Sequence, residues 1–108
     1  MDKFTISEMQ EMQKMLQEKY KDKWEPICVE VGQNKLLWMI GEIGEVIDIV
    51  KKHGGEQASS NPDIRRSLIE EMADVLMYFN DVMLCYGITE EELKESYVAK
   101  FKRNMERW

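Results

Sequence analysis

Two short segments of the chain each place a pair of carboxylates three residues apart. The first pair is Glu42 and Glu45, and the second is Glu71 and Asp74. Both segments carry apolar residues at helical spacing, and residues three apart on a helix are neighbours on one face. Each segment therefore directs two carboxylates roughly the same way, beside apolar surface.

If the two predicted helices pack together, four carboxylates converge. Two like charges about 6 Å apart repel by roughly 3 kcal/mol at an effective dielectric constant of about 20, so such a cluster requires a cation. Oxygen ligands suit hard divalent ions, Mg²⁺ above all where a phosphate substrate shares the metal. Because Asp and Glu make up 21 of the 108 residues, a solvated acidic face fits the same spacing. The spacing alone leaves both interpretations open.

The order and content of the two segments resemble a known family. Glu42-Ile-Gly-Glu45-Val, followed after a loop by Glu71-Met-Ala-Asp74-Val-Leu, is similar to the metal-binding signature of the all-α nucleoside triphosphate pyrophosphohydrolases, the MazG-like family. The resemblance covers about residues 33–108. It implies an all-α MazG-like bundle assembled as a homodimer or homotetramer, in which a neighbouring subunit supplies part of each active site.

The resemblance also implies a magnesium-dependent hydrolase. Glu42, Glu45, Glu71 and Asp74 would hold Mg²⁺, with Mn²⁺ as a substitute. Glu45 would also be the catalytic base that takes a proton from the attacking water. The substrate would be a ribo- or deoxynucleoside triphosphate, cleaved between its α and β phosphates to a nucleoside monophosphate and pyrophosphate. The implied role is cleansing of the nucleotide pool.

Three aromatic residues are candidates for contacts with the base and sugar. Trp24 and Trp38 offer flat faces on which a nucleobase could stack. Tyr78 lies one turn after Asp74, an offset at which a tyrosine can line the nucleotide pocket in the resembling enzymes. Each of the three would equally fit as an amphipathic residue at the edge of the protein core.

The C-terminal segment holds the one basic run of the chain. Lys100, Asn104 and Arg103 are similar to the Lys…Asn…Arg pattern with which the family tends to end, which implies contact with the substrate phosphates. Cations near a helix C-terminus also interact favourably with the helix dipole. This second explanation requires no substrate.

Length and composition predict one globular domain over residues 1–108, with 44% hydrophobic and 33% charged residues. The net charge of −6 argues against a nucleic-acid partner, because such proteins usually carry a basic face. No apolar run is long enough to span a membrane. Cys28 and Cys85 are isolated and no leader segment is visible, which predicts a cytoplasmic protein.

Helical periodicity predicts four helices and no strands. They would cover about residues 7–21, 31–52, 61–86 and 89–108, with the second and third antiparallel and adjacent. Residues 53–61 are polar and are predicted to form a loop, either a lid or a plain linker. Asn80 and Asp81 interrupt the apolar run of the third helix, so they are predicted to be its solvent-facing points.

Two other functions fit parts of the sequence. A non-catalytic helical oligomerisation or partner-binding module would carry the same acids on a solvated face. A di-iron carboxylate bundle is disfavoured, because its sites use Glu-x-x-His pairs and the only histidine, His53, falls in the predicted loop. Stabilisation by divalent ions would distinguish a hydrolase from a module. The acidic motifs do not identify the base or the sugar.

Overall fold

The computed structural model describes residues 3–107, and every regular element in that range is helical. The elements are α1 (Ile6–Lys19), the 3₁₀ turn η1 (Val29–Val31), α2 (Gly32–His53), α3 (Gly55–Ser60), α4 (Pro62–Cys85) and α5 (Glu90–Arg107). The all-α prediction is confirmed. The count of four helices was wrong, because a fifth, α3, forms within the predicted loop.

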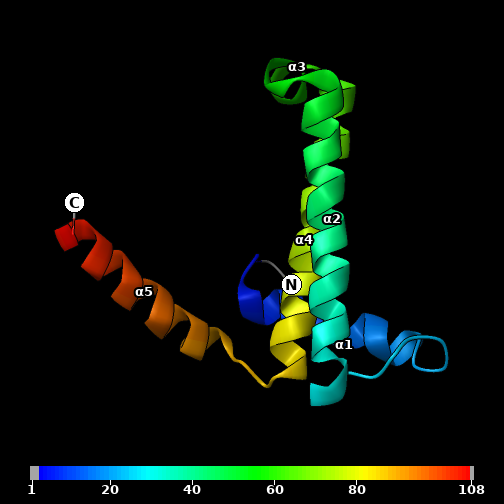
Figure 1. Cartoon of the computed structure of the whole chain (residues 1–108). Coiled ribbons are helices and arrows are strands. Elements are labelled where there is room, and N and C mark those ends of the chain that lie inside the picture. The colour runs from blue at the N-terminus through cyan, green and yellow to red at the C-terminus, as the bar shows by residue number, and fades with distance from the viewer. Residues whose placement is uncertain (1–2, 108) are drawn as a thin grey trace.

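The long helices α2 and α4 form an antiparallel pair (Figure 1). They contain 22 and 24 residues, so each is about 35 Å long at 1.5 Å per residue. The short helix α3 closes one end of this pair, and α1 crosses it near the other end. The predicted adjacency of α2 and α4 is confirmed. Their pairing determines which acidic residues of the two helices meet.

Across residues 3–107, no helix combines the length and the apolar character that crossing a bilayer requires.

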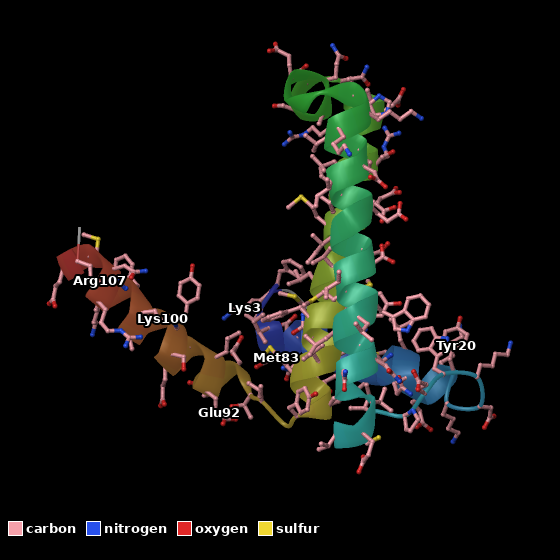
Figure 2. All side chains as sticks on the ribbon, viewed as in Figure 1. Lys3, Tyr20, Met83, Glu92, Lys100 and Arg107 are labelled. Carbon is pink, nitrogen blue, oxygen red and sulfur yellow. The ribbon has the colours of Figure 1, made fainter. Side chains whose placement is uncertain are left out.

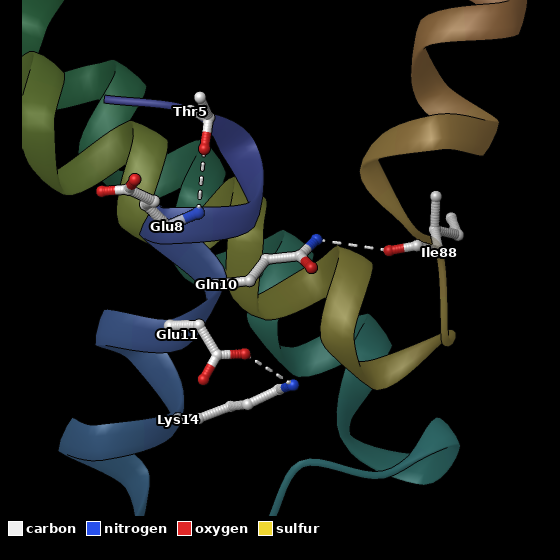
Figure 3. Close-up of polar contacts among 6 residues, drawn as sticks. All are labelled: Thr5, Glu8, Gln10, Glu11, Lys14 and Ile88. Carbon is white, nitrogen blue, oxygen red and sulfur yellow. Dashed lines mark hydrogen bonds and ion pairs between the residues drawn. The ribbon is translucent and has the colours of Figure 1, made fainter. Parts of the chain in front are cut away.

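Side-chain caps fix where α1 and α4 begin. The Thr5 hydroxyl oxygen accepts a hydrogen bond from the Glu8 backbone N–H at 3.1 Å (Figure 3). The Asn61 side-chain oxygen accepts from the backbone N–H groups of Asp63 and Ile64. Each cap satisfies donors that have no partner inside the helix.

A glycine reverses the chain between α2 and α3. Gly54 has φ +84° and ψ 154°, a backbone conformation that is essentially restricted to glycine. After this turn, α3 packs against α2 and α4, with Ala58 only 2% exposed. The segment predicted as a loop is therefore a short helix that covers the end of the pair.

The last helix, α5, extends away from the rest of the molecule (Figure 1). Gly87, at φ +65°, ends the preceding helix. A capping box then starts α5: the Thr89 hydroxyl oxygen accepts from the Glu92 N–H at 3.2 Å, and the Glu92 carboxylate accepts from the Thr89 N–H at 3.1 Å.

Two contacts hold the start of α5 against α1. The Ser7 backbone N–H and hydroxyl donate to the Glu90 carboxylate at 3.2 and 3.0 Å. The Gln10 side-chain amide donates to the Ile88 carbonyl oxygen at 3.3 Å (Figure 3). Past these contacts α5 extends away from the other helices (Figure 1).

Much apolar surface is left uncovered. The buried apolar residues within 3–107 are Val31, Ala58, Met83 and Cys85. Large apolar side chains that are at least 40% exposed line one face of α2, and they include Leu37, Ile40, Ile43 and Ile47. An apolar face of this length is typical of a protein–protein interface.

The prediction that Asn80 and Asp81 face solvent was wrong. Asn80 is 0% exposed and Asp81 is 6% exposed. The Asn80 side-chain amide donates to the Leu76 carbonyl oxygen at 3.0 Å, and Asp81 has two charged or polar partners, described below. Burial of the Asp81 carboxylate and of the Asn80 amide nitrogen is tolerated because these groups have partners, whereas the buried Asn80 side-chain oxygen has no hydrogen-bond partner among the described residues.

Candidate metal centre and adjoining pocket

Glu42 on α2 meets Glu71 and Asp74 on α4 across the helix pair. One carboxylate oxygen from each residue can be chosen so that all three atoms lie within 4.8 Å of one another. All three side chains are partly buried. We refer to these three residues as the carboxylate cluster.

The carboxylate cluster is electrostatically unfavourable without a cation. The pKa of Glu71 is raised above its ordinary value, first by a hydrogen bond with the Glu42 carboxyl group. Desolvation and the negative charges of Glu42, Asp74 and Glu70 act in the same direction. A raised pKa means that the Glu71 carboxyl group holds a proton more tightly than an isolated glutamate does. A divalent cation would take the place of that proton, because metal binding and protonation compete for the same oxygens.

The donor set fits a hard divalent ion. Carboxylate oxygens are the ligands that Mg²⁺ and Mn²⁺ prefer. Three side chains leave coordination positions for water and for substrate phosphate oxygens, as is usual for protein-bound Mg²⁺. The carboxylate cluster therefore has a donor set that could hold a hard divalent cation.

Glu45 lies outside the carboxylate cluster. Its side chain is exposed, one turn of α2 beyond Glu42. It lines a separate hollow of about 300 Å³, together with Asp48, His53 and Asp63. The structure thus brings together three of the four predicted metal ligands, and the role of Glu45 as a ligand or base stays a prediction.

A pocket of about 270 Å³ adjoins the carboxylate cluster and is shared with it through Asp74. All three predicted aromatic contacts, Trp24, Trp38 and Tyr78, line it. The rings of Trp38 and Tyr78 are 6.5 Å apart between centroids and 11° from parallel, an offset stack that forms one continuous aromatic wall. The other lining residues are Gln13, Leu16, Glu25, Lys35, Met77 and Asp81.

A buried polar group of three residues forms part of this pocket. One Asp81 oxygen accepts a hydrogen bond from the Gln13 side-chain amide at 2.8 Å. The other lies 3.5 Å from the Lys35 ammonium nitrogen, and the Lys35 and Asp81 side chains are 10% and 9% exposed. We call Gln13, Lys35 and Asp81 the polar triad. Sequence reasoning missed it, and the one available signal was an acid inside an apolar helical run.

The environment of Tyr78 keeps its hydroxyl group protonated. Its pKa is raised first by desolvation and then by the negative charges of Glu42, Asp81 and Asp74. The Lys35 ammonium lies 5.9 Å from the centre of its ring, a distance suited to a cation–π contact. At neutral pH the Tyr78 hydroxyl can therefore donate a hydrogen bond into the pocket.

Lys100 and Asn104 do not join the carboxylate cluster within one chain. Both lie on α5, which points away from the α2–α4 pair, as the labelled Lys100 shows in Figure 2. They line a separate groove with Tyr97, Phe101 and Met105. Their predicted contact with substrate phosphates therefore requires a second copy of the chain.

The fold and site define an all-α protein with a carboxylate cluster beside an aromatic pocket. A model of the MazG nucleotide pyrophosphohydrolase domain matches residues 30–107. Since this match covers most of the sequence, the chain belongs to the MazG nucleotide pyrophosphohydrolase family, and the expected family is confirmed. No curated protein and no solved structure matched the chain significantly.

Proposed function

We propose that the protein hydrolyses a nucleoside triphosphate between its α and β phosphates. One water is consumed, and the products are a nucleoside monophosphate and pyrophosphate. The observation that carries this proposal is the meeting of Glu42, Glu71 and Asp74 beside an aromatic pocket, in a chain of this family. Cleansing of the nucleotide pool is the role that we assign to the activity.

The carboxylate cluster is assigned to hold Mg²⁺. When bound, the ion supplies positive charge for the phosphates and increases the acidity of water. Glu45 is our candidate for accepting the proton of the attacking water, since it lies one turn from Glu42 and is not part of the cluster. Trp24, Trp38 and Tyr78 are assigned to the base and sugar.

We infer that the active unit is a homodimer or homotetramer. On α5, Tyr97, Phe101 and Met105 are 72%, 56% and 70% exposed, and the apolar face of α2 is also uncovered. Packing α5 of one subunit against another would cover such surface. It would also allow Lys100 and Asn104 to reach the phosphates bound at a neighbouring site, where their polar or positive groups would offset the acidic charge.

A hydrolysis panel tests the proposal. Purified protein with millimolar Mg²⁺ is given each common ribo- and deoxynucleoside triphosphate, and the products are separated by chromatography. Monophosphate with pyrophosphate is the expected result, and Asp74→Asn should abolish it. The matched control is Glu70→Gln, an exposed acid on the same helix and outside the cluster.

Two outcomes would contradict the proposal in different ways. Diphosphate with orthophosphate would mean that the scissile bond is wrong. If no substrate is cleaved and Mg²⁺ does not change the melting temperature relative to EDTA, the acids are surface groups. The chain would then be better described as a non-catalytic oligomerisation or partner-binding module.

A further inference from the structure

We propose that Asp81, held by Lys35 and Gln13, selects nucleotides whose base carries an exocyclic amino group far from the sugar. Cytosine and adenine have this group, whereas uracil, thymine and hypoxanthine carry a carbonyl oxygen in its place. The inference rests on the proposed function, because it assumes that the aromatic pocket holds the base of a nucleotide.

The separation between the polar triad and the carboxylate cluster matches the length of a nucleotide from its α-phosphate to the far edge of its base. Asp74, Tyr78 and Asp81 follow one another at spacings of four and three along α4, so they share one face of the helix. All three line the pocket. Seven residues of helix span about 10 Å, which is comparable to the reach from the α-phosphate to the far edge of the base. A nucleotide with its phosphates at Asp74 therefore directs that edge toward Asp81.

The chemistry of the base edge then decides which nucleotide fits. In a pyrimidine the substituent furthest from the sugar is at carbon 4, and in a purine the equivalent substituent is at carbon 6. An ionised carboxylate only accepts hydrogen bonds. The amino groups of cytosine and adenine can donate to it, whereas a carbonyl oxygen at the same place is another acceptor and would be repelled.

Lys35 adds a second discrimination next to the first. In cytosine and adenine, the ring nitrogen beside the amino group carries no hydrogen and accepts a hydrogen bond. In uracil and hypoxanthine the corresponding nitrogen is protonated and donates. The Lys35 ammonium, 3.5 Å from Asp81, is a donor only. With Asp81 facing the exocyclic group and Lys35 facing the ring nitrogen, the pair presents an acceptor beside a donor in the order that complements the amino-bearing edge and not the carbonyl-bearing one.

The Asp81 carboxylate is held by Gln13 and Lys35 and can still accept further hydrogen bonds. A carboxylate has about four lone-pair positions, and the contacts with Gln13 and Lys35 occupy two of them. Stabilisation of the fold does not explain the ion pair well, because a buried ion pair is often no better than a well-packed apolar pair of the same volume. Its position in the pocket wall is accounted for by a role in recognition.

The experiment compares matched nucleotides that differ at this one position. The values of kcat/KM are measured for dCTP against dUTP, and for dATP against dITP, with the wild-type protein and Mg²⁺. We expect the amino-bearing member of at least one pair to be preferred about tenfold or more, because a buried polar group left unpaired penalises the wrong substrate. The two pairs show whether the pocket takes a pyrimidine or a purine.

The matched variant is Asp81→Asn, which supplies an amide donor and should move the dCTP/dUTP or dATP/dITP ratio toward one or below it. Asp63→Asn, an exposed acid on the same helix, should leave the ratio unchanged. If Asp81→Asn fails to fold because Lys35 is left unpaired, the double variant Lys35→Met with Asp81→Leu removes both charges. The same change in ratio is expected of that variant.

The outcomes separate this inference from the proposed function. If the wild-type protein cleaves dUTP and dITP with kcat/KM values equal to or above those for dCTP and dATP, the inference is overturned and the proposed function stands. If nothing is cleaved, the proposed function fails. The inference is then tested by quenching of tryptophan fluorescence with dCMP against dUMP and dAMP against dIMP. Tighter binding of an amino-bearing member supports it, whereas equal, weaker or absent binding overturns it.

Discussion

A carboxylate oxygen of Glu71 on α4 lies within 4.8 Å of one of Glu42 on α2, and the interaction between the two carboxyl groups is the largest cause of the raised pKa of Glu71. The two residues come from different helices, so the contact exists only when α2 and α4 are packed together. Folding thus brings together acids that repel one another. A cation at this place would relieve the repulsion and stabilise the folded state.

Replacing Glu71 with Gln should raise the melting temperature in EDTA and abolish the further rise caused by Mg²⁺. Because the pKa of Glu71 is raised in the folded state, its protonated form does not oppose folding at low pH. As the pH rises above the ordinary glutamate value of 4.5, the charged form reduces the stability of the folded state. Glu71→Gln carries no charge at this position, so it avoids that reduction in stability at pH 7. Thermal unfolding measures both effects, with Glu95→Gln, an exposed acid on α5, as the control. An unchanged Mg²⁺ response in Glu71→Gln would exclude the assigned metal site.

Replacing Glu45 with Gln should lower kcat about 100-fold or more, which is the usual size of a general-base contribution. The stabilisation by Mg²⁺ should remain, since Glu45 is outside the carboxylate cluster. Steady-state kinetics and thermal unfolding are measured on the same preparation. Loss of both properties would make Glu45 a metal ligand, and full activity would remove it from the mechanism.

Mixing two inactive variants should restore activity if α5 of one subunit completes the site of another. Asp74→Asn damages the carboxylate cluster of its own subunit. Lys100→Met removes the proposed phosphate contact that its subunit makes at the site of the other subunit. In a symmetric dimer, random exchange of subunits gives mixed dimers with one intact site each, so about a quarter of the wild-type activity should return. Recovery is followed after mixing under conditions that permit exchange. No recovery, with mixed dimers demonstrated, would place Lys100 in its own subunit's site or outside the site.

Replacing Gly54 with Ala should lower the free energy of unfolding by about 1–3 kcal/mol, because alanine is strained in this backbone conformation. The neighbouring Gly55 has open space around its position and no positive φ. Gly55→Ala should therefore be neutral or stabilising by up to about 1 kcal/mol. Urea denaturation of the two variants compares them directly. Equal stabilities would mean that the turn before α3 is not as described.

The Glu90 carboxyl group should titrate below the ordinary value of 4.5. Its pKa is lowered first by the Ser7 backbone N–H and then by the Ser7 hydroxyl. Because the pKa is depressed, the contact with α1 is present above the ordinary value and is lost as the pH falls through the lowered one. Titration by NMR reads this directly, and Ser7→Ala should move the pKa upward. An ordinary value in the wild-type protein would show that the start of α5 is not held at Ser7.

The positions of the carboxylate cluster residues could be predicted because local spacing and helix pairing determine them. Glu71 and Asp74 share a face by their three-residue spacing alone. Their meeting with Glu42 needs only an antiparallel pair of helices with a short connection. Glu45 shows the limit of this reasoning, since a side chain one turn along the same helix lies outside the cluster.

The polar triad could not be predicted from local patterns. Gln13 and Asp81 are 68 residues apart in sequence, and an acid in an apolar run is more often exposed than buried. Its burial depends on partners that only the tertiary structure brings. Helix α3 was missed for a different reason: six residues are too few to show helical periodicity, and Gly54 with Gly55 indicated an end to regular structure.

The wall of the pocket combines residues from two parts of the chain. Gln13, Leu16 and Trp24 precede the segment 30–107 that matches the MazG domain, whereas the carboxylate cluster lies within it. Substitutions within residues 3–29 can therefore change the shape and chemistry of this pocket while the carboxylate cluster stays the same. Exchange of this leading segment is a route to redesign of the pocket.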